Sequence, residues 1–570
     1  MTQTPPSNVP DSRGQNAYRA DPALAALMQI YLPGDQRSAL LPQLDRMGDL
    51  VGDRLEELAL AADRNPPVLQ IRDRTGAPRQ RIDKHPAYRK MEDIAFSQFG
   101  LAAMSHRAGV FGLAGAAHPV AKYALVYLFV QAEFGLCCPL SMTDSLTRTL
   151  RRFGSTDLQD RYLAGLTSQD MDALLQGAMF MTEQAAGSDV GAITTQARLQ
   201  DGQWRLHGDK WFCSNPDAAL AMVLARPDGE GQGTRGLSLF LVPRDLPAGT
   251  PNAIRILRLK DKMGTRSMAS GEVALDGAFA WLVGDPGQGF RQMTDMINMS
   301  RLANGVRSAG LMRRATSEAL FIARHRRAFG QALIEMPLMR RQLAKMLVTS
   351  EQGRSMVFHT ARVLAAADQG DAAMAPVLRI LTPLIKFRTC RDARKVAGDA
   401  MEVRGGCGYI EEFSDARVLR DSHLGSIWEG TSNIVALDVM RAARRDGGFQ
   451  ALDGYLRGLS GQSPEITAAL NQAMALVSAV SDEAGPEVRR AASALYHVTS
   501  AAFLAWEADR LRAFDPVQAQ DRARLSRMVL AHRLTARDPL APPEAEPNWL
   551  PGLLARAGID PDAPAHEASA

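Results

Sequence analysis

The chain has 570 residues, of which 46% are hydrophobic and 22% charged, a balance that excludes a disordered or fibrous protein. At roughly 150 residues per domain, this length predicts three or four domains. The 66 basic and 62 acidic residues leave a net charge of +4, which is too small to predict that the chain as a whole binds a polyanion.

The cysteines and the apolar stretches indicate the compartment. The five cysteines form no CxxC pair, which argues against a disulfide framework and a structural zinc site, so no metal is expected. The first thirty residues hold no apolar signal segment, and charged residues interrupt the apolar stretch 101–142 too often for a membrane span. We therefore expect a cytoplasmic protein without a membrane segment.

The first half of the chain changes its hydrophobic period once. Between residues 21 and 172 apolar residues recur every three or four positions, which predicts helices, and the turn-rich piece 65–85 predicts a hairpin on their flank. Between about 177 and 284 the period becomes two, and Asp201-Gly202 marks a hairpin turn. A small β-barrel or sandwich is expected here, with strands near 194–199, 204–207, 219–225, 236–243, 254–259 and 271–275.

The second half of the chain is predicted to be helical. Four helices near 288–328, 336–367, 372–405 and 431–444 indicate a bundle of long antiparallel helices. Further helices are expected over 449–538, and the tail, rich in Pro, Ala and Glu, is expected to be partly disordered. The predicted domains are thus a helical domain (1–176), a β-barrel (177–285), a helical bundle (286–445), an additional helical domain (446–540) and a tail (541–570).

The segment MTEQAAGSD (181–189) lies where the helices give way to strands. Thr182, Ser188 and the intervening glycine offer hydroxyls and unobstructed backbone N–H groups, which suit a phosphate or a carbonyl-rich ring. A capped interdomain turn would use the same residues.

The segment KWFCSN (210–215) follows the predicted hairpin. Adjacent aromatic residues in a strand point to opposite faces, so one of Trp211 and Phe212 can pack in the core while the other lies against a planar ligand, with Ser214 beside it. Plain core packing is the alternative.

Two further segments lie at predicted helix ends. RRAFG (326–330) closes a long helix, where its cations would stabilise the helix dipole before a glycine cap or, alternatively, bind a diphosphate. MEVRGGCGY (401–409) runs from a helix into a glycine-rich turn, where backbone can approach a ligand closely.

The segment SIWEGTSNI (426–434) places a carboxylate on a loop. Thr431 is expected to cap the next helix, whose N-terminal amides form an anion site. Burial beside Trp428 would suit Glu429 to act as a base, although a surface glutamate before a capped helix is the simpler alternative.

Taken in this order and spacing, the five segments resemble the acyl-CoA dehydrogenase family. The segments at 65–69, 136–143 and 260–267, together with the additional C-terminal helices, resemble its AidB-like, alkylation-response subgroup. The resemblance implies a mainly α fold with a central β-domain, bound FAD, an acyl-CoA substrate, an electron-transfer flavoprotein as acceptor and a homotetramer. In this family a carboxylate takes the α-proton of the thioester while the β-hydrogen leaves as hydride.

The resemblance also implies roles for individual residues. Glu429 is expected to be the catalytic base, because the other position used in the family is here Ser300, which precedes Arg301 and cannot take a proton unaided. Ser188, Arg301 and Gly430 are expected to contact the substrate. The expected FAD contacts are Met181, Thr182, Ser188, Phe212, Ser214, Arg326, Phe329, Gly405, Gly406, Trp428, Thr431 and Asn433, with Arg326 and Phe329 reaching across a subunit interface.

Three positions depart from the family pattern. Trp428 replaces a common tyrosine, Phe212 replaces a tryptophan, and Asn433 replaces a glutamine. FAD binding should survive these changes, whereas the acyl pocket, and with it the chain length of the substrate, is left open.

Two other functions remain open from the sequence. The AidB-like subgroup is associated with DNA, and Arg522, Arg524, Arg527, Arg533 and Arg537 cluster on one predicted helix. However, residues 451–540 contain as many acidic as basic residues, so oligomer contacts are the more natural role for this part of the chain. An acyl-CoA oxidase would differ only in passing electrons to oxygen.

Overall fold

The computed structural model describes residues 9–480, 485–536, 538, 540 and 545–558. The chain forms two compact units. The helical unit contains residues 1–56, 118–132 and 304–570, and the β unit contains residues 57–117 and 133–303. The segment expected to form one N-terminal helical domain therefore contributes to both units.

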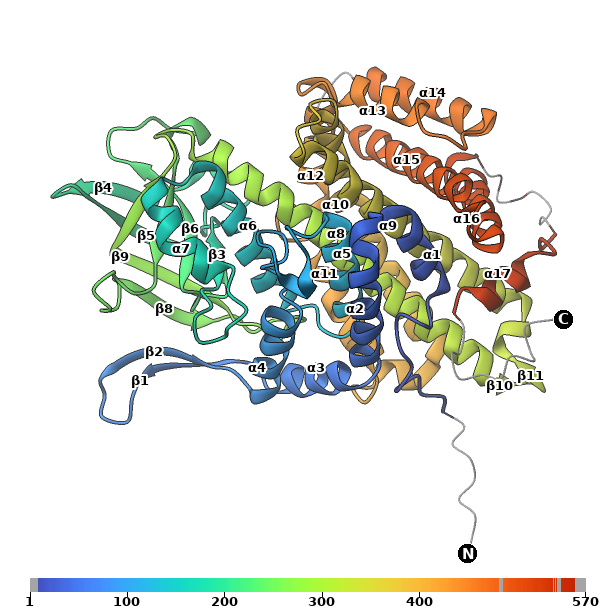
Figure 1. Cartoon of the computed structure of the whole chain (residues 1–570), viewed down its shortest axis with the longest axis horizontal. Helices are drawn as coiled ribbons and strands as arrows, with labels where there is room; N and C mark the ends of the chain where they lie inside the picture. Colours follow the sequence, from blue (N-terminus) through green and yellow to red (C-terminus); the bar gives the residue numbers. More distant parts are fainter. Residues whose placement is uncertain (1–8, 481–484, 537, 539, 541–544, 559–570) are drawn as a thin grey trace, which may run out of the picture. The chain divides into compact units, whose positions relative to one another are not determined.

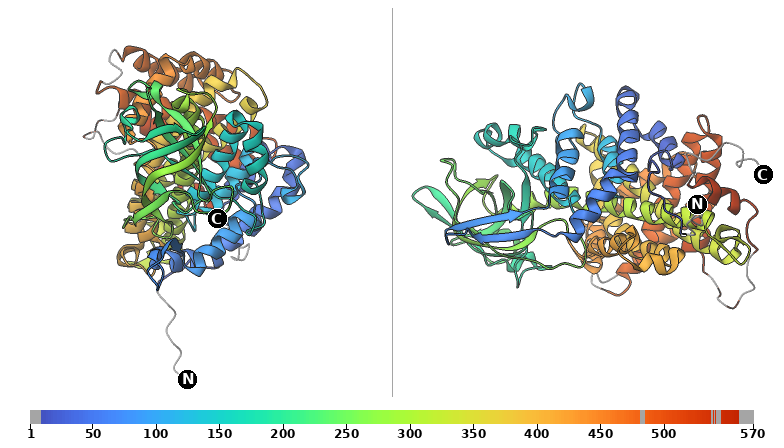
Figure 2. Two further views of the ribbon diagram at one scale, coloured as in Figure 1. Left: turned by 90° about the vertical axis from the view of Figure 1, so that its left-hand side faces the viewer. Right: turned by 90° about the horizontal axis from the view of Figure 1, so that it is seen from below.

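The strands of the β unit close into a barrel (Figures 1 and 2). β6 pairs with β4 and β7, β7 pairs with β9, and β9 pairs through β5 back to β4, so the ring has no free edge at these strands. The short β3 and β8 add to β6 and β9. The predicted small barrel is confirmed; its strands are β3 Gly177–Phe180, β4 Gln196–Gln200, β5 Gln203–Ser214, β6 Leu220–Pro227, β7 Ser238–Pro243, β8 Ile254–Leu259 and β9 Ser270–Val283.

Alternating residues of these strands fill the barrel. Leu206, Val223, Phe240 and Val273 are fully buried in one core. The β4–β5 turn has Asp201 at φ +48° and Gly202 at φ +74°, the left-handed pair that a two-residue hairpin requires. The predicted DG hairpin is thus confirmed.

The flanking hairpin is also present, as β1 Val68–Arg72 and β2 Pro78–Asp83. It is held on the barrel by Gln80, whose side-chain oxygen accepts from the Ile256 amide at 2.7 Å and whose carbonyl accepts from Arg244 at 2.5 Å. The remaining helices of the β unit are α4 Pro86–Glu92, α6 Cys137–Phe153 and α7 Thr156–Leu166.

The helical unit contains the four predicted long helices, with α8 beginning in the β unit. α11 Ser414–Leu424 was not predicted. The C-terminal helices pack on the bundle, where α15 contacts α9, α10 and α12. The helices are α1 Pro22–Tyr31, α2 Gly34–Gly52, α3 Arg54–Arg64, which continues into the β unit, α5 Pro119–Phe129, α8 Gly289–His325, α9 Pro337–Asp368, α10 Met374–Arg404, α12 Ser432–Arg444, α13 Gly448–Arg457, α14 Pro464–Ala479, α15 Val488–Leu511 and α16 Pro516–Val529.

One unpredicted helix and one wrong expectation concern the end of this unit and of α8. The predicted tail contains a helix, α17 Leu550–Arg556, because Leu550, Leu553 and Leu554 give it a buried apolar face; residues 541–544 and 559–570 lie outside the described residues, so the expected partial disorder stays a prediction. The wrong expectation concerns the end of α8. Residues 326–330 do not form a glycine-capped helix end. α8 stops at His325, and the strands β10 Arg327–Ala328 and β11 Gln331–Ala332 form a hairpin.

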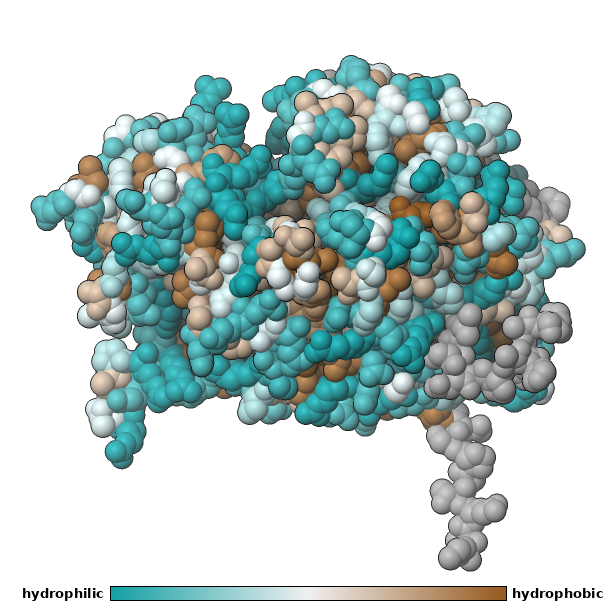
Figure 3. Space-filling model, in the orientation of Figure 1, coloured by the Kyte–Doolittle hydropathy of each residue, from teal (hydrophilic) through white to brown (hydrophobic). Residues whose placement is uncertain are grey.

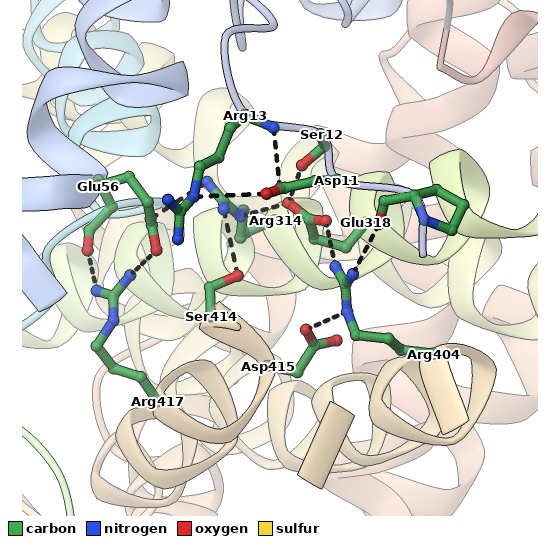
Figure 4. Close-up of polar contacts among 12 residues, drawn as sticks. Asp11, Ser12, Arg13, Glu56, Arg314, Glu318, Arg404, Ser414, Asp415 and Arg417 are labelled. Carbon is green, nitrogen blue, oxygen red and sulfur yellow. Dashed lines mark hydrogen bonds and ion pairs between the residues drawn. The ribbon is translucent and has the colours of Figure 1, made fainter. Parts of the chain in front are cut away.

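Two networks of buried charges hold the helical unit together. In the first, Arg404 at the end of α10 donates to Glu318 of α8 and to Asp415 of α11, both at 2.6 Å (Figure 4). Glu318 also accepts from Ser12, which ties the N-terminal segment to the bundle. Burial raises the pKa of Asp415 to about 6, although Arg404 opposes the shift.

The second network joins α9 to the C-terminal helices. Glu351 of α9 pairs with Arg354 and, at 2.6 Å, with Arg522 of α16, while Arg354 also pairs with Asp21 before α1. Each of these side chains is at most 3% exposed. Charges so deeply buried are stable only when they are paired, so α9 and α16 depend on each other.

On the face drawn in Figure 3, hydrophobic residues are interspersed with hydrophilic ones. Among the described residues, no helix combines the length and apolar character that a membrane crossing needs.

Candidate active site

The predicted site residues fall in both compact units, and each group is described within its own unit. The β unit contains Met181, Thr182, Ser188, Phe212, Ser214 and Arg301, and the helical unit contains Arg326, Phe329, Gly405, Gly406, Trp428, Glu429, Gly430, Thr431 and Asn433.

In the β unit, an ion pair holds the segment 181–189 against β5. Lys210 is fully buried and donates to Glu183 at 2.8 Å. Glu183 also accepts from the amides and hydroxyls of Thr194 and Thr195 at 2.5 to 3.1 Å. Burial alone would raise the pKa of Glu183, but Lys210 and these hydrogen bonds lower it to about 2. Glu183 is therefore ionised, and its contacts fix the backbone beside Thr182, whose carbonyl accepts from the Trp211 amide at 2.8 Å.

A bulge changes the expected alternation in KWFCSN. The pairing of β5 with β9 shifts register between Lys210 and Cys213, which breaks the period of two. Neither Trp211 nor Phe212 enters the core; Cys213 does, and Phe212 is 59% exposed. Lys260 lies over the Trp211 ring at 3.3 Å. The expectation that one of the two aromatic rings packs in the core is wrong.

The other predicted residues of this unit differ in exposure. Ser188 is exposed in its loop and Ser214 is half-buried at the end of β5. A Cβ added to Gly187 would meet no atom within 4 Å, so the backbone between Ala186 and Ser188 is open to a ligand. Arg301 lies on α8 and is 9% exposed.

In the helical unit, Glu429 lies on a tight loop between α11 and α12. Its φ is +56° and that of Gly430 is +103°, so two successive residues have left-handed backbone. For a residue other than glycine this conformation costs about 1–3 kcal/mol and persists only where the surroundings hold it.

Three long-range contacts surround this loop. Asn304 of α8 donates through its Nδ2 to the Glu429 carboxylate at 2.5 Å. Lys386 of α10 donates to the Gly430 carbonyl at 2.7 Å. The guanidinium of Arg307 lies 4.9 Å from the centre of the Trp428 ring. The loop is thereby tied to both helices on which it rests.

The beginning of α12 differs from the expectation in one respect. Thr431 is the N-cap residue, but its side chain makes no capping hydrogen bond. Asn433, in the first turn of the helix, accepts through its side-chain oxygen from Arg489 of α15 at 3.2 Å. A residue of the additional C-terminal domain thus touches a predicted cofactor contact.

The remaining predicted residues gather at the far end of α10. Arg326 donates to the Arg404 carbonyl at 2.8 Å, and its guanidinium lies 3.1 Å from where a Gly405 Cβ would be. Gly405 has φ +75°, so glycine is favoured there for both reasons. Phe329, at the tip of the β10–β11 turn, is 97% exposed.

Several residues in these groups were not predicted as site residues. These residues belong to ordinary helical stretches: Asn304, Lys386 and Arg307 reach the Glu429 loop, and Arg489 reaches α12, only through tertiary packing. No group of side chains suited to a metal ion occurs in the described ranges.

Protein-family models cover most of the chain. The acyl-CoA dehydrogenase C-terminal domain matches residues 287–444 and the middle domain matches 178–278. The chain belongs to the acyl-CoA dehydrogenase family. Its first part, residues 7–173, matches the N-terminal domain of the adaptive response protein AidB, which identifies the AidB-like subgroup.

Individual relatives agree with this assignment. The chain is 37% identical over 445 residues to the putative acyl-CoA dehydrogenase AidB of Escherichia coli, covering 76% of this chain and 79% of that protein. The crystal structure of Caenorhabditis elegans ACDH-11 in complex with C11-CoA has a TM-score of 0.85 at 28% identity and covers 94% of both chains. An acyl-CoA dehydrogenase from Bacillus anthracis complexed with FAD shares the fold, with a TM-score of 0.65 at 20% identity over 78% of this chain and 80% of that one.

Proposed function

We propose that the protein is an FAD-dependent dehydrogenase of acyl-CoA thioesters in which Glu429 is the catalytic base. One observation carries the proposal: a carboxylate with left-handed backbone is held on a loop by two buried helices, in a member of the acyl-CoA dehydrogenase family. Backbone strain maintained in this way is typical of functional residues.

The residues of each unit fit a flavin dinucleotide. The exposed Phe212 ring and the open backbone at Gly187 offer a planar contact and donors for the ring. The Arg326 guanidinium lies beside the backbone of Gly405, which has no Cβ to obstruct a ligand. This combination suits a diphosphate. We assign the ring contacts to Met181, Thr182, Ser188, Phe212 and Ser214, and the other FAD contacts to Arg326, Phe329, Gly405, Gly406, Trp428, Thr431 and Asn433.

The chemistry divides between the base and the cofactor. FAD, when bound, supplies the acceptor for the β-hydride. Glu429 removes the α-proton, so that the α C–H bond breaks and an O–H bond forms on the carboxylate. The backbone N–H of Glu429 then faces the developing oxyanion of the thioester, which lowers the barrier to proton removal. We assign Ser188, Arg301 and Gly430 to substrate contacts.

The partners follow from the same proposal. The substrate is an acyl-CoA, in keeping with the C11-CoA complex of ACDH-11, and the acceptor is an electron-transfer flavoprotein. The exposed Phe329 and Tyr409, 97% and 82% accessible, form part of the contact between copies of a homotetramer, where Arg326 meets the FAD of a neighbouring subunit.

DNA protection is the second candidate, and the charges on α16 argue against it. Arg522 is 1% exposed and paired with Glu351, and Arg524 pairs with Asp521 at 3.1 Å. Arg527 and Arg533 are exposed, but the structure does not describe Arg537, and paired or buried arginines release few counterions from DNA.

Anaerobic stopped-flow mixing of the FAD-loaded protein with acyl-CoA tests the proposal. The wild type is expected to lose its flavin absorbance, whereas Glu429→Gln keeps FAD and does not bleach. Bleaching of Glu429→Gln at the wild-type rate would overturn the assignment of the base. Fast reoxidation of the bleached protein by oxygen, compared with a flavoprotein acceptor, would identify an oxidase instead.

A further inference from the structure

The backbone at Glu429 and Gly430 needs support from outside the loop, because its left-handed conformation is unfavourable by itself. Part of that support is steric. A Cβ added to Gly425 would lie 2.9 Å from Ser308 Oγ and 3.4 Å from Cys390 Cβ, so the loop begins in close contact with α8 and α10.

The rest of the backbone support is a charged hydrogen bond. Lys386 is 1% exposed, and its ammonium donates to the Gly430 carbonyl at 2.7 Å. Hydrogen bonds from a charged donor are stronger than those between neutral groups. This bond fixes the Gly430–Thr431 peptide, one peptide beyond Glu429, and so restrains the backbone from which the Glu429 side chain projects.

The carboxylate itself is held by Asn304, which is fully buried on α8. The 2.5 Å contact from Nδ2 to Glu429 Oε2 orients the amide, because its oxygen would repel a carboxylate. The backbone carbonyl of Asn304 accepts from the Cys390 thiol at 3.6 Å. Burial raises the pKa of that thiol, so Cys390 remains a neutral S–H donor.

The side-chain oxygen of Asn304 gives the amide a second possible role beside Glu429. Asn304 Oδ1 is buried and has no hydrogen-bond partner among the described residues. A buried acceptor without a partner is unfavourable. Because an amide carries both a donor and an acceptor, Asn304 can donate to the carboxylate and, after rotation, accept from the carboxylic acid that proton capture creates.

We propose that Asn304 and Lys386 are the positioning residues of the catalytic base: Lys386 fixes the backbone of the Glu429 loop, and Asn304 aims the carboxyl group and partners it in both protonation states. This inference rests on the proposed function, because it takes Glu429 to be the base. Neither residue needs to touch the substrate.

Hydrogen exchange of the FAD-free protein, read by mass spectrometry, tests the positioning without any turnover. Amides 425–431 are expected to exchange roughly tenfold faster in Asn304→Leu and in Lys386→Met than in the wild type. Thr316→Val is the matched control, since Thr316 is equally buried on α8 and lies three turns beyond Asn304. If amides 425–431 exchange in Asn304→Leu and in Lys386→Met as slowly as in the wild type, the inference is overturned.

A second measurement isolates proton removal in the FAD-loaded protein. 3,3-Dimethylbutanoyl-CoA has no β-hydrogen, so in D2O it can only exchange its α-protons. Asn304→Asp has the shape of asparagine but lacks the N–H donors, and it is expected to slow this exchange at least tenfold, whereas Thr316→Val leaves it within about twofold. An exchange rate in Asn304→Asp equal to that of the wild type would refute the role of the amide.

Glu429→Gln, measured alongside, separates the two proposals. If Glu429→Gln exchanges α-protons as fast as the wild type, the proposed function fails, whatever Asn304 does. If Glu429→Gln stops exchange while Asn304→Asp does not slow it, only the positioning inference fails.

Discussion

The buried ion pair between Lys210 and Glu183 supports a strong prediction for the β unit. Lys210→Met removes the ammonium but keeps most of the volume of the side chain. Glu183, which is 6% exposed, then remains as a buried carboxylate without its cation.

The expected effect follows from what stays behind. Breaking a buried ion pair by removing one partner costs about 3–5 kcal/mol. Glu183 keeps its hydrogen bonds from Thr194 and Thr195, so the lower end of that range applies. About 3 kcal/mol corresponds to roughly a 150-fold loss of protection, since 1.4 kcal/mol is a factor of ten.

Native-state hydrogen exchange of peptides from β5 and the segment 177–189 measures this loss locally, because a chain with two units need not unfold in one step. Lys395→Met is the control, since Lys395 is 76% exposed and its pair with Asp399 contributes at most about 0.5 kcal/mol. Adding Glu183→Gln to Lys210→Met should restore part of the stability. The reasoning would be refuted if the free energy of local opening fell in Lys210→Met by no more than about 1 kcal/mol beyond its fall in the control.

Three further predictions concern stability. Because the pKa of Glu183 is lowered from 4.5 to about 2, its contribution, at most about 3 kcal/mol, is complete above pH 4.5 and lost as the pH falls through about 2; acid unfolding of Glu183→Gln should lack this component. Gly310→Ala should destabilise the helical unit by about 1–3 kcal/mol, because its Cβ would lie 2.3 Å from Val130 Cγ1 and 2.7 Å from the Tyr127 carbonyl. By contrast, Gly398→Ala, whose Cβ meets nothing nearer than 4.0 Å, should stabilise α10 by about 0.5–1 kcal/mol, and urea unfolding compares the two. Arg522→Leu should destabilise the helical unit by about 3–5 kcal/mol; an unchanged urea midpoint together with weaker DNA binding would instead favour the DNA hypothesis.

Local patterns predicted much of the fold. The change of period and the Asp201-Gly202 turn were sufficient for the barrel, because strand alternation and hairpin turns depend on neighbouring residues. α17 was missed because three leucines within a proline-rich segment give too short an apolar pattern. The bulge after Lys210 was missed since one extra residue leaves no mark on composition.

The candidate site was predicted unevenly for the same reason. The loop motif marked Glu429, but Asn304 lies 125 residues from it in the chain, and no local pattern links the two. For Arg522 the error was the opposite. Its place among several arginines on one helix predicts a surface cation, yet its pairing with Glu351 buries it.

The network around Glu351 bears on whether the C-terminal helices of this protein can be exchanged for those of a relative. A chain that ended near residue 445 would deprive Glu351 of Arg522, while Gln352 would lose His497 and Ser500, and Ser355 would lose Glu507. The C-terminal helices of this protein are therefore not a separable module that could be replaced alone by those of a relative. A working chimera would have to take α9, α15 and α16 from the same parent.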